Sequence, residues 1–192
     1  MPDAISALDG RSASAHGMTL REDGLRGMIS LRGDLGQAKL RSVCTGLTGV
    51  EFPDRMTAKS DGQQGLCWMS PDEVLVLVPH ERTAEARGKI AEALAGSHHL
   101  ATDVSDARAV MILEGPHVRE VIAKLAPVDL HPESFRPGDF RRTRLGQVAA
   151  AFWMRDAESF EIVCFRSVAD YAFRLLARSM ETGGTGYFPQ GT

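Results

Sequence analysis

Residues 66–78 read Leu-Cys-Trp-Met-Ser-Pro-Asp-Glu-Val-Leu-Val-Leu-Val and carry the clearest structural signal in the sequence. Two apolar runs, 66–69 and 74–78, flank the polar segment 70–73. Pro and Asp in that segment supply the backbone angles and side-chain hydrogen bonds of a turn. The stretch therefore predicts a β-hairpin, and tight hairpins join antiparallel strands.

Helix and strand patterns alternate on both sides of this hairpin. Apolar residues at helical spacing predict helices, the first with Asp34 as its N-cap and the last with Ser167. A third helix should follow Pro116, and a fourth should cover about 81–95. Further strands are expected at 27–31, up to Asp103, and at 110–113, 140–145, 147–154 and 160–165. This order predicts an α+β protein of two small lobes, each a mainly antiparallel sheet with helices on one face.

The two ends of the chain show no sustained period. Residues 1–24 are rich in Ala, Ser, Gly, Asp and Arg, and residues 181–192 include the Gly-rich run 183–186. Such segments predict a flexible N-terminal arm and a flexible tail, which either grip neighbouring subunits or are frayed ends. Between them we expect the first lobe at 25–104 and the second at 105–180.

Bulk composition indicates an ordinary globular protein, with 43% hydrophobic and 24% charged residues. The net charge of -3 gives no reason to expect a nucleic acid partner. Three cysteines far apart in sequence predict reduced, buried thiols in a cytoplasmic protein. No apolar run reaches the roughly eighteen residues that a membrane helix needs, so we expect no membrane partner.

Motifs that bind phosphates, metals or substrates are missing. The sequence has no Gly-x-x-x-x-Gly-Lys-Ser/Thr loop, and no Gly-x-Gly-x-x-Gly follows a predicted strand. Gly-x-Ser-x-Gly, His-Glu-x-x-His and Cys-x-x-Cys are also absent. We therefore expect no catalytic, cofactor-binding or metal-binding residue in this chain, and any chemistry must be supplied elsewhere.

Five residues on two turns remain as candidates for an interface or a ligand-binding turn: Trp68, Asp72, Asp103, Asp106 and Arg108. Trp68 beside the hairpin turn is either an anchor for a partner or a core residue. In the second turn, Asp103 could hold an amine while Arg108 binds a carboxylate. The other interpretation, which we favour, is an Asx-turn with a local ion pair.

An ordered series of short stretches runs along the chain: Met28–Asp34, Trp68–Glu73, Asp103–Arg108, Gly115-Pro116, Asp129–Pro132, Phe135–Gly138 and Ser167–Tyr171. This series, over about residues 25–178, resembles the gamma subunits of heterotetrameric sarcosine oxidase. The resemblance implies the folate-binding fold of the glycine cleavage T-protein, consistent with two α+β lobes.

What the resemblance implies about function is a non-catalytic gamma subunit that supports assembly. Alpha, beta and delta subunits would be its partners, and FAD, FMN, NAD, zinc and tetrahydrofolate would be bound by those partners and not by this chain. Such a complex oxidatively demethylates sarcosine to glycine and passes the one-carbon unit to tetrahydrofolate. The alternative is a stand-alone folate-binding protein resembling aminomethyltransferases.

Overall fold

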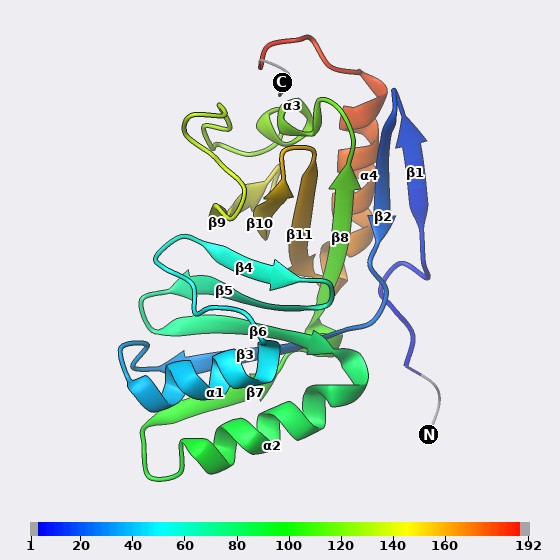
Figure 1. Ribbon diagram of the computed structural model, residues 1–192. Helices are drawn as coiled ribbons and strands as arrows, with labels where there is room; N and C mark the ends of the chain where they lie inside the picture. Colours follow the sequence, from blue (N-terminus) through cyan, green and yellow to red (C-terminus); the bar gives the residue numbers. More distant parts are fainter. Residues whose placement is uncertain (1–3, 189–192) are drawn as a thin grey trace. The chain divides into compact units, whose positions relative to one another are not determined.

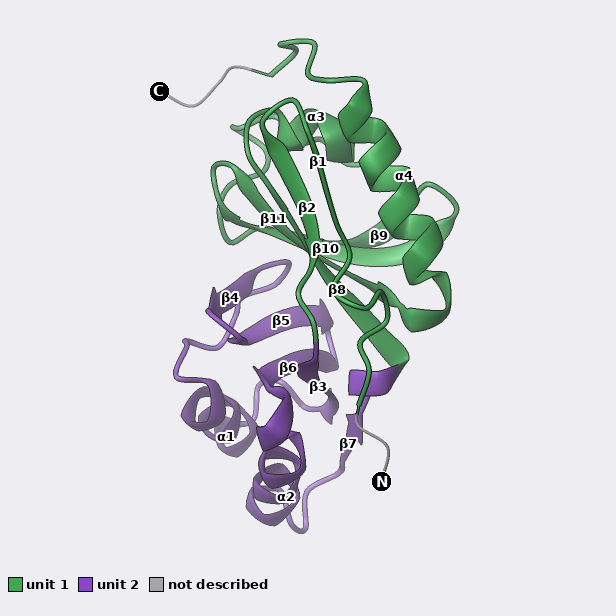
Figure 2. Ribbon diagram, turned by 90° about the vertical axis from the view of Figure 1, so that its right-hand side faces the viewer, with its two compact units in different colours: residues 1–24, 107–192 green, residues 25–106 purple. Residues whose placement is uncertain are grey.

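The computed structural model describes residues 4–188, and the chain divides into two compact units (Figures 1 and 2). Unit 1 contains the residues up to Gly24 and those from Ala107 onward, and unit 2 contains Leu25–Asp106. Each unit combines one antiparallel sheet with two α-helices, so the predicted α+β class is confirmed. Parts of the arm expected at 1–24 and of the tail expected at 181–192, namely residues 1–3 and 189–192, lie outside the described residues.

Unit 2 consists of a five-stranded sheet with helices on one face (Figure 1). The strand order is β4 (Ala58–Asp61), β5 (Gln64–Ser70), β6 (Glu73–Pro79), β3 (Arg26–Gly33) and β7 (His99–Asp103). The helices are α1 (Ala38–Thr48) and α2 (Thr83–Ala93), with 3-10 turns η1 (His80–Arg82) and η2 (Ser105–Ala107). The predicted hairpin is confirmed as β5 and β6, which pair from Gly65↔Leu77 to Ser70↔Glu73.

Strand β6 forms the centre of the unit 2 core. Its valines join Ile29 and Leu31 of β3 in one cluster with Leu40 of α1 and Ile90 of α2. Leu75 and Leu77 lie on the opposite face of the strand and are also fully buried. Burial on both faces explains why residues 74–78 read as a continuous apolar run instead of an alternating one.

Unit 1 has a six-stranded sheet and two helices. The strand order is β1 (Ser12–Ala15), β2 (Met18–Glu22), β8 (Arg108–Glu114), β11 (Ser159–Phe165), β10 (Val148–Asp156) and β9 (Phe140–Leu145). Helix α3 (Val118–Ala123) and helix α4 (Ala169–Glu181), which follows the 3-10 turn η3 (Arg166–Val168), pack into the same core.

An aromatic group anchors the unit 1 core. The rings of Phe135, Phe152 and Phe160 have centroids 5.9–6.0 Å apart in each pairing, a separation at which tilted and edge-on contacts stabilise. Helix α4 adds Leu176 and Met180 to this core, and both are fully buried. Burial of such side chains contributes about 1.5–3 kcal/mol each.

The prediction of a flexible arm over residues 1–24 is wrong for the strands β1 and β2. Strand β2 pairs with β8 from Thr19↔Glu114 to Glu22↔Met111, and β1 pairs with β2. The inward positions of β2 include Met18 and Leu20, but the last one is Glu22. Two apolar residues are too short an alternation to predict a strand, so composition suggested an arm instead.

Helix starts and one edge strand also differ from the prediction. Helix α1 has Gln37 as its N-cap, because the Asp34 carboxylate accepts a hydrogen bond from Gly36 N (2.9 Å) in a turn before the helix. Ser167 lies in η3, and the N-cap of α4 is Val168, one residue later than expected. Strand β4 was not predicted, because its sequence Ala-Lys-Ser-Asp has only one buried position.

Gly115 lies where two backbone segments of unit 1 approach each other closely. It has φ +115°, and an added Cβ would lie 2.6 Å from the carbonyl oxygen of Gly17 and 2.9 Å from Met18 Cα. Gly115→Ala should therefore lower the free energy of unfolding by about 2–4 kcal/mol, measured by urea titration. Gly88→Ala in α2 is the control, because open space surrounds Gly88 and Ala favours a helix by about 0.5–1 kcal/mol. Equal urea midpoints for Gly115→Ala and the wild type would contradict the close approach.

Candidate functional site

A polar network surrounds the β5–β6 turn in unit 2. Asp72 accepts hydrogen bonds from Ser70 Oγ (2.5 Å) and Arg32 Nη1 (3.1 Å). The other terminal nitrogen of Arg32 donates to the buried Glu73 (2.8 Å), which also accepts from Ser30 Oγ (2.7 Å). The Ser70 hydroxyl, followed by the Arg32 charge, holds the pKa of Asp72 below its ordinary value. The candidate Asp72 is thus committed to fixing its own turn.

Trp68 lies on the helix-facing side of the same hairpin. It is half-buried and packs against the unit 2 core, opposite Val74 in the strand register. Its backbone N–H donates to Thr57 O (3.1 Å). The geometry therefore matches the alternative of a core tryptophan.

The charged residues of the second candidate turn are divided between the two units: Asp103 and Asp106 belong to unit 2 and Arg108 to unit 1. Asp103 ends β7, and its Oδ1 accepts hydrogen bonds from Ser105 N (3.0 Å) and Ser105 Oγ (2.6 Å). This is the Asx-turn that we favoured from the sequence. Asp106 is exposed in η2, whereas Arg108 begins β8 and belongs to unit 1.

The cysteine side chains of this chain lie in the interior of the two units. Cys44, Cys67 and Cys164 are free and buried. Burial raises the pKa of Cys44 to about 12 and that of Cys164 to about 11, so both thiols stay protonated near neutral pH.

Among residues 4–188, no group of three His, Cys, Asp or Glu side chains could hold a metal ion. None of the helices in this described range has the length and hydropathy of a transmembrane span.

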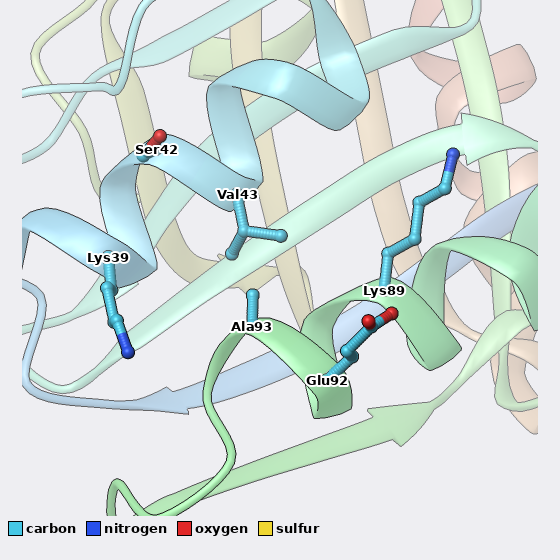
Figure 3. Close-up of a pocket in the computed structure, with 6 residues that line it drawn as sticks. All are labelled: Lys39, Ser42, Val43, Lys89, Glu92 and Ala93. Carbon is cyan, nitrogen blue, oxygen red and sulfur yellow. The ribbon is translucent and has the colours of Figure 1, made fainter.

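A shallow groove of about 560 Å³ lies between α1 and α2 (Figure 3). Its lining consists of Lys39, Ser42 and Val43 from α1 and Lys89, Glu92 and Ala93 from α2. Lys89 also pairs with Glu85 one helical turn away (2.5 Å). Small ligands are usually held in concave, mostly apolar pockets, so this charged groove resembles a solvated helix surface or a protein contact.

Two buried glutamates in unit 1, which sequence reasoning missed, fix the two ends of the described chain. The first is Glu22 at the end of β2, with 7% of its surface exposed. Its carboxylate accepts hydrogen bonds from Ser6 Oγ (2.7 Å), Leu8 N (2.8 Å) and Gly10 N (2.8 Å). We call this arrangement the N-terminal clamp.

The C-terminal clamp is built in the same way around Glu120 of α3, which is 4% exposed. Glu120 accepts hydrogen bonds from the consecutive backbone N–H groups of Thr185, Gly186 (3.0 Å) and Tyr187 (3.1 Å), and from Thr185 Oγ1 (2.8 Å). Burial disfavours the negative charge, but the hydrogen bonds, led by those of Thr185, hold the pKa of Glu120 below its ordinary value. The prediction of a flexible tail thus does not fit the hydrogen-bonded segment 185–187.

A sequence signal for the clamps exists, but it is incomplete. Glu22 occupies an inward position of β2, and Glu120 lies beside Val121 in the apolar stripe of α3. A charged residue at an inward position indicates a buried hydrogen-bonding partner. Those partners are backbone N–H and hydroxyl groups in Ser- and Gly-rich segments, whose composition instead suggests disorder.

The family comparison covers most of both units. A family model described as "Sarcosine oxidase, gamma subunit family" matches residues 32–181. The sarcosine oxidase gamma subunit of Corynebacterium sp. (strain U-96) is 28% identical over 173 residues, which are 88% of this chain and 82% of that protein. The gamma subunit of Arthrobacter sp. is 26% identical over 155 residues, 80% of this chain and 75% of that protein.

Solved structures confirm the predicted T-protein-like fold. Heterotetrameric sarcosine oxidase from Corynebacterium sp. U-96, in complex with pyrrole 2-carboxylate, contains a chain with a TM-score of 0.80 and 24% identity, covering 92% of this chain and 94% of that one. Glycine cleavage system aminomethyltransferase T from Bartonella henselae has a TM-score of 0.60 and 12% identity, covering 83% of this chain and 45% of that one. At these identities the likeness concerns the fold.

Removal of the Glu120 carboxylate should release the C-terminal segment. Glu120→Ala leaves the N–H groups of 185–187 without their acceptor, so we expect about 2–4 kcal/mol lower stability. Chymotrypsin should then cleave after Tyr187 faster than in the wild type, as followed by mass spectrometry. Glu181→Ala is the matched control, because that exposed carboxylate pairs only with Arg178 among the described residues. Equal cleavage rates in Glu120→Ala and the wild type would contradict the clamp.

The same carboxylate predicts a pH dependence of stability. The folded pKa of Glu120 is lowered, so its contribution is fully present above the unfolded pKa of about 4.3 and is lost as pH falls through the folded pKa. The difference in free energy of unfolding between the wild type and Glu120→Gln should therefore shrink between about pH 5 and pH 3. Urea titrations at several pH values measure it. A difference that stays constant across this range would be inconsistent with an ionised clamp.

Proposed function

Because this chain belongs to the sarcosine oxidase gamma subunit family, we propose that it is the non-catalytic gamma subunit of a heterotetrameric sarcosine oxidase and supports assembly of that complex. The observation that carries the proposal is the family match over residues 32–181, which includes most of the sheets of both units. The same fold in a chain of the Corynebacterium enzyme, over 92% of the present chain, supports it.

The site geometry supports a scaffolding role. Asp72 and Asp103 hold turns, Glu22 and Glu120 hold chain ends, and the buried thiol of Cys44 has a raised pKa. A catalytic acid, base or nucleophile needs a reactive atom that a substrate can reach. These side chains serve the fold of the chain itself, so catalysis is assigned to other subunits.

The proposed partners are the alpha, beta and delta subunits, and the proposed location is the cytoplasm. FAD, FMN, NAD, zinc and tetrahydrofolate would be bound by those partners. The complex as a whole would demethylate sarcosine to glycine and pass the one-carbon unit to tetrahydrofolate. Permanent complexes usually bury more than about 2,000 Å² at an interface, so this chain would contribute mainly shape and surface.

A competing proposal is a stand-alone folate-binding protein resembling aminomethyltransferases. The fold similarity to aminomethyltransferase T, with a TM-score of 0.60, is the observation in its favour. Because one fold supports many functions, ligand binding decides between the two proposals. Titration calorimetry of the lone chain with tetrahydrofolate makes that distinction, and we expect no binding heat at millimolar folate.

Assembly is tested by expressing this chain with and without the alpha, beta and delta subunits of the same organism. The chain alone should show no flavin absorbance and no sarcosine oxidation. With the other subunits it should co-elute in size-exclusion chromatography as one active complex. The three partners without this chain should yield less intact complex, because a permanent interface would be left exposed.

Two results would refute the proposal. One is a flavin-coloured, active preparation that contains this chain alone. The other is a chain that elutes separately from its co-expressed partners. Glu181→Ala, an exposed substitution, serves as the control for handling losses and should assemble like the wild type.

A further inference from the structure

The edge of the unit 2 sheet formed by β7 is open to solvent. Strand β7 is last in the strand order and pairs with β3 from Ile29↔Asp103 to Gly33↔His99 (Figure 1). Every residue of β7 is exposed or half-buried. Leu100 has 58% of its surface exposed, which makes it one of the large apolar side chains that the fold leaves uncovered.

The phase of the β3–β7 ladder determines which backbone groups point outward. Val104 N donates to Met28 O (2.8 Å), so this pair is hydrogen-bonded. Bonded and non-bonded pairs alternate along antiparallel strands, so Thr102 and Leu100 bond to β3. The alternate residues of the strand direct their N–H and C=O groups to the open edge: His99, Ala101 and Asp103.

The other edge strands carry features that discourage pairing with another chain. Strands β1 and β4 have only four residues each, and β4 includes Lys59. Strand β9 carries three arginines. Short strands and basic side chains are the usual protections of sheet edges. Strand β7 has five residues with no Lys, Arg or Pro, and its register with β3 is unbroken.

The hydrogen-bonding groups and side chains along this edge indicate what kind of molecule can bind there. Outward N–H and C=O groups at alternate residues are matched by the backbone of another extended chain, not by a small molecule. The exposed Leu100 offers an apolar contact, and the carboxylates of Asp103 and Asp106 are exposed at the far end of the strand. The complementary segment is therefore extended, with an apolar residue facing Leu100 and a basic residue near Asp103.

We propose that β7 is a docking edge that receives an extended segment of a partner subunit as an additional strand of the unit 2 sheet. This inference rests on the proposed function, because it requires a partner subunit. It goes beyond that function by naming the strand, the hydrogen-bonding groups and the chemistry of the segment that binds.

Ala101→Pro is the sharpest test. Proline removes the outward N–H of Ala101 without removing a β3 hydrogen bond, and edge strands tolerate proline at such positions. We expect its affinity for the alpha, beta and delta subunits to fall roughly tenfold or more, in a titration that follows co-elution. The thermal unfolding midpoint of the lone variant should stay near that of the wild type.

Ser14→Pro in β1 is the matched control. Glu22 N donates to Arg11 O (2.9 Å), and the same alternation gives Ser14 an outward N–H on an edge that we do not propose as a docking site. This variant should assemble with wild-type affinity. A second pair tests the side chain: Leu100→Lys should weaken assembly, whereas Met56→Lys, at another exposed apolar residue of unit 2, should not.

The outcomes separate the inference from the proposed function. If the wild-type chain does not assemble, the proposed function fails and the docking edge fails with it. If the wild type assembles and Ala101→Pro and Leu100→Lys assemble equally well, the docking edge alone is refuted. If the lone chain dimerises and Ala101→Pro abolishes only that dimer, the occupant is a second copy, and the proposal is overturned.

Discussion

The hydrogen-bonded pairing of β2 with β8 is the contact on which unit 1 depends. It joins Thr19–Glu22 to Met111–Glu114, about ninety residues later in the chain, and so adds the N-terminal hairpin to the edge of a sheet otherwise built from the C-terminal half. The close approach of Gly115 to Gly17 is a direct consequence, since any side chain there would push the two strands apart. Long-range pairing of this kind orders a segment that has little structural tendency of its own.

Once β2 is in place, two buried carboxylates extend the order to both ends of the described chain. A buried charge is stable only when hydrogen bonds replace its lost hydration. Glu22 obtains these from residues 6–10 and Glu120 from residues 185–187, so each glutamate needs its terminal segment as much as the segment needs the glutamate. This mutual requirement acts together with the burial of Leu8 and Phe188 in the unit 1 core to hold two segments that are otherwise poor in apolar residues.

The sequence was sufficient for elements whose signal is local. The hairpin at 66–78, both sheets' central strands and the helical stripes could be read from apolar spacing, because each of those residues is buried within its own lobe. Strands β1 and β2 and the two clamps could not be predicted, because their stability comes from partners distant in sequence. The two candidate turns are found where the sequence predicted turns. The hydrogen bonds of Asp72 with Ser70 and Arg32 could be identified only from the structure.

The distribution of polar groups favours a role based on surface over one based on reaction. The buried glutamates of the two clamps are saturated by internal hydrogen bonds, and the Cys44 and Cys164 thiols are held protonated by burial. Along β7, alternate residues direct their backbone N–H and C=O groups to the edge of the sheet, beside the exposed Leu100. A backbone edge cannot accept protons or attack a substrate at neutral pH, but it can pair with another strand over several residues. The intermolecular contact that we propose for this fold therefore relies on backbone groups of β7 and not on a reactive side chain.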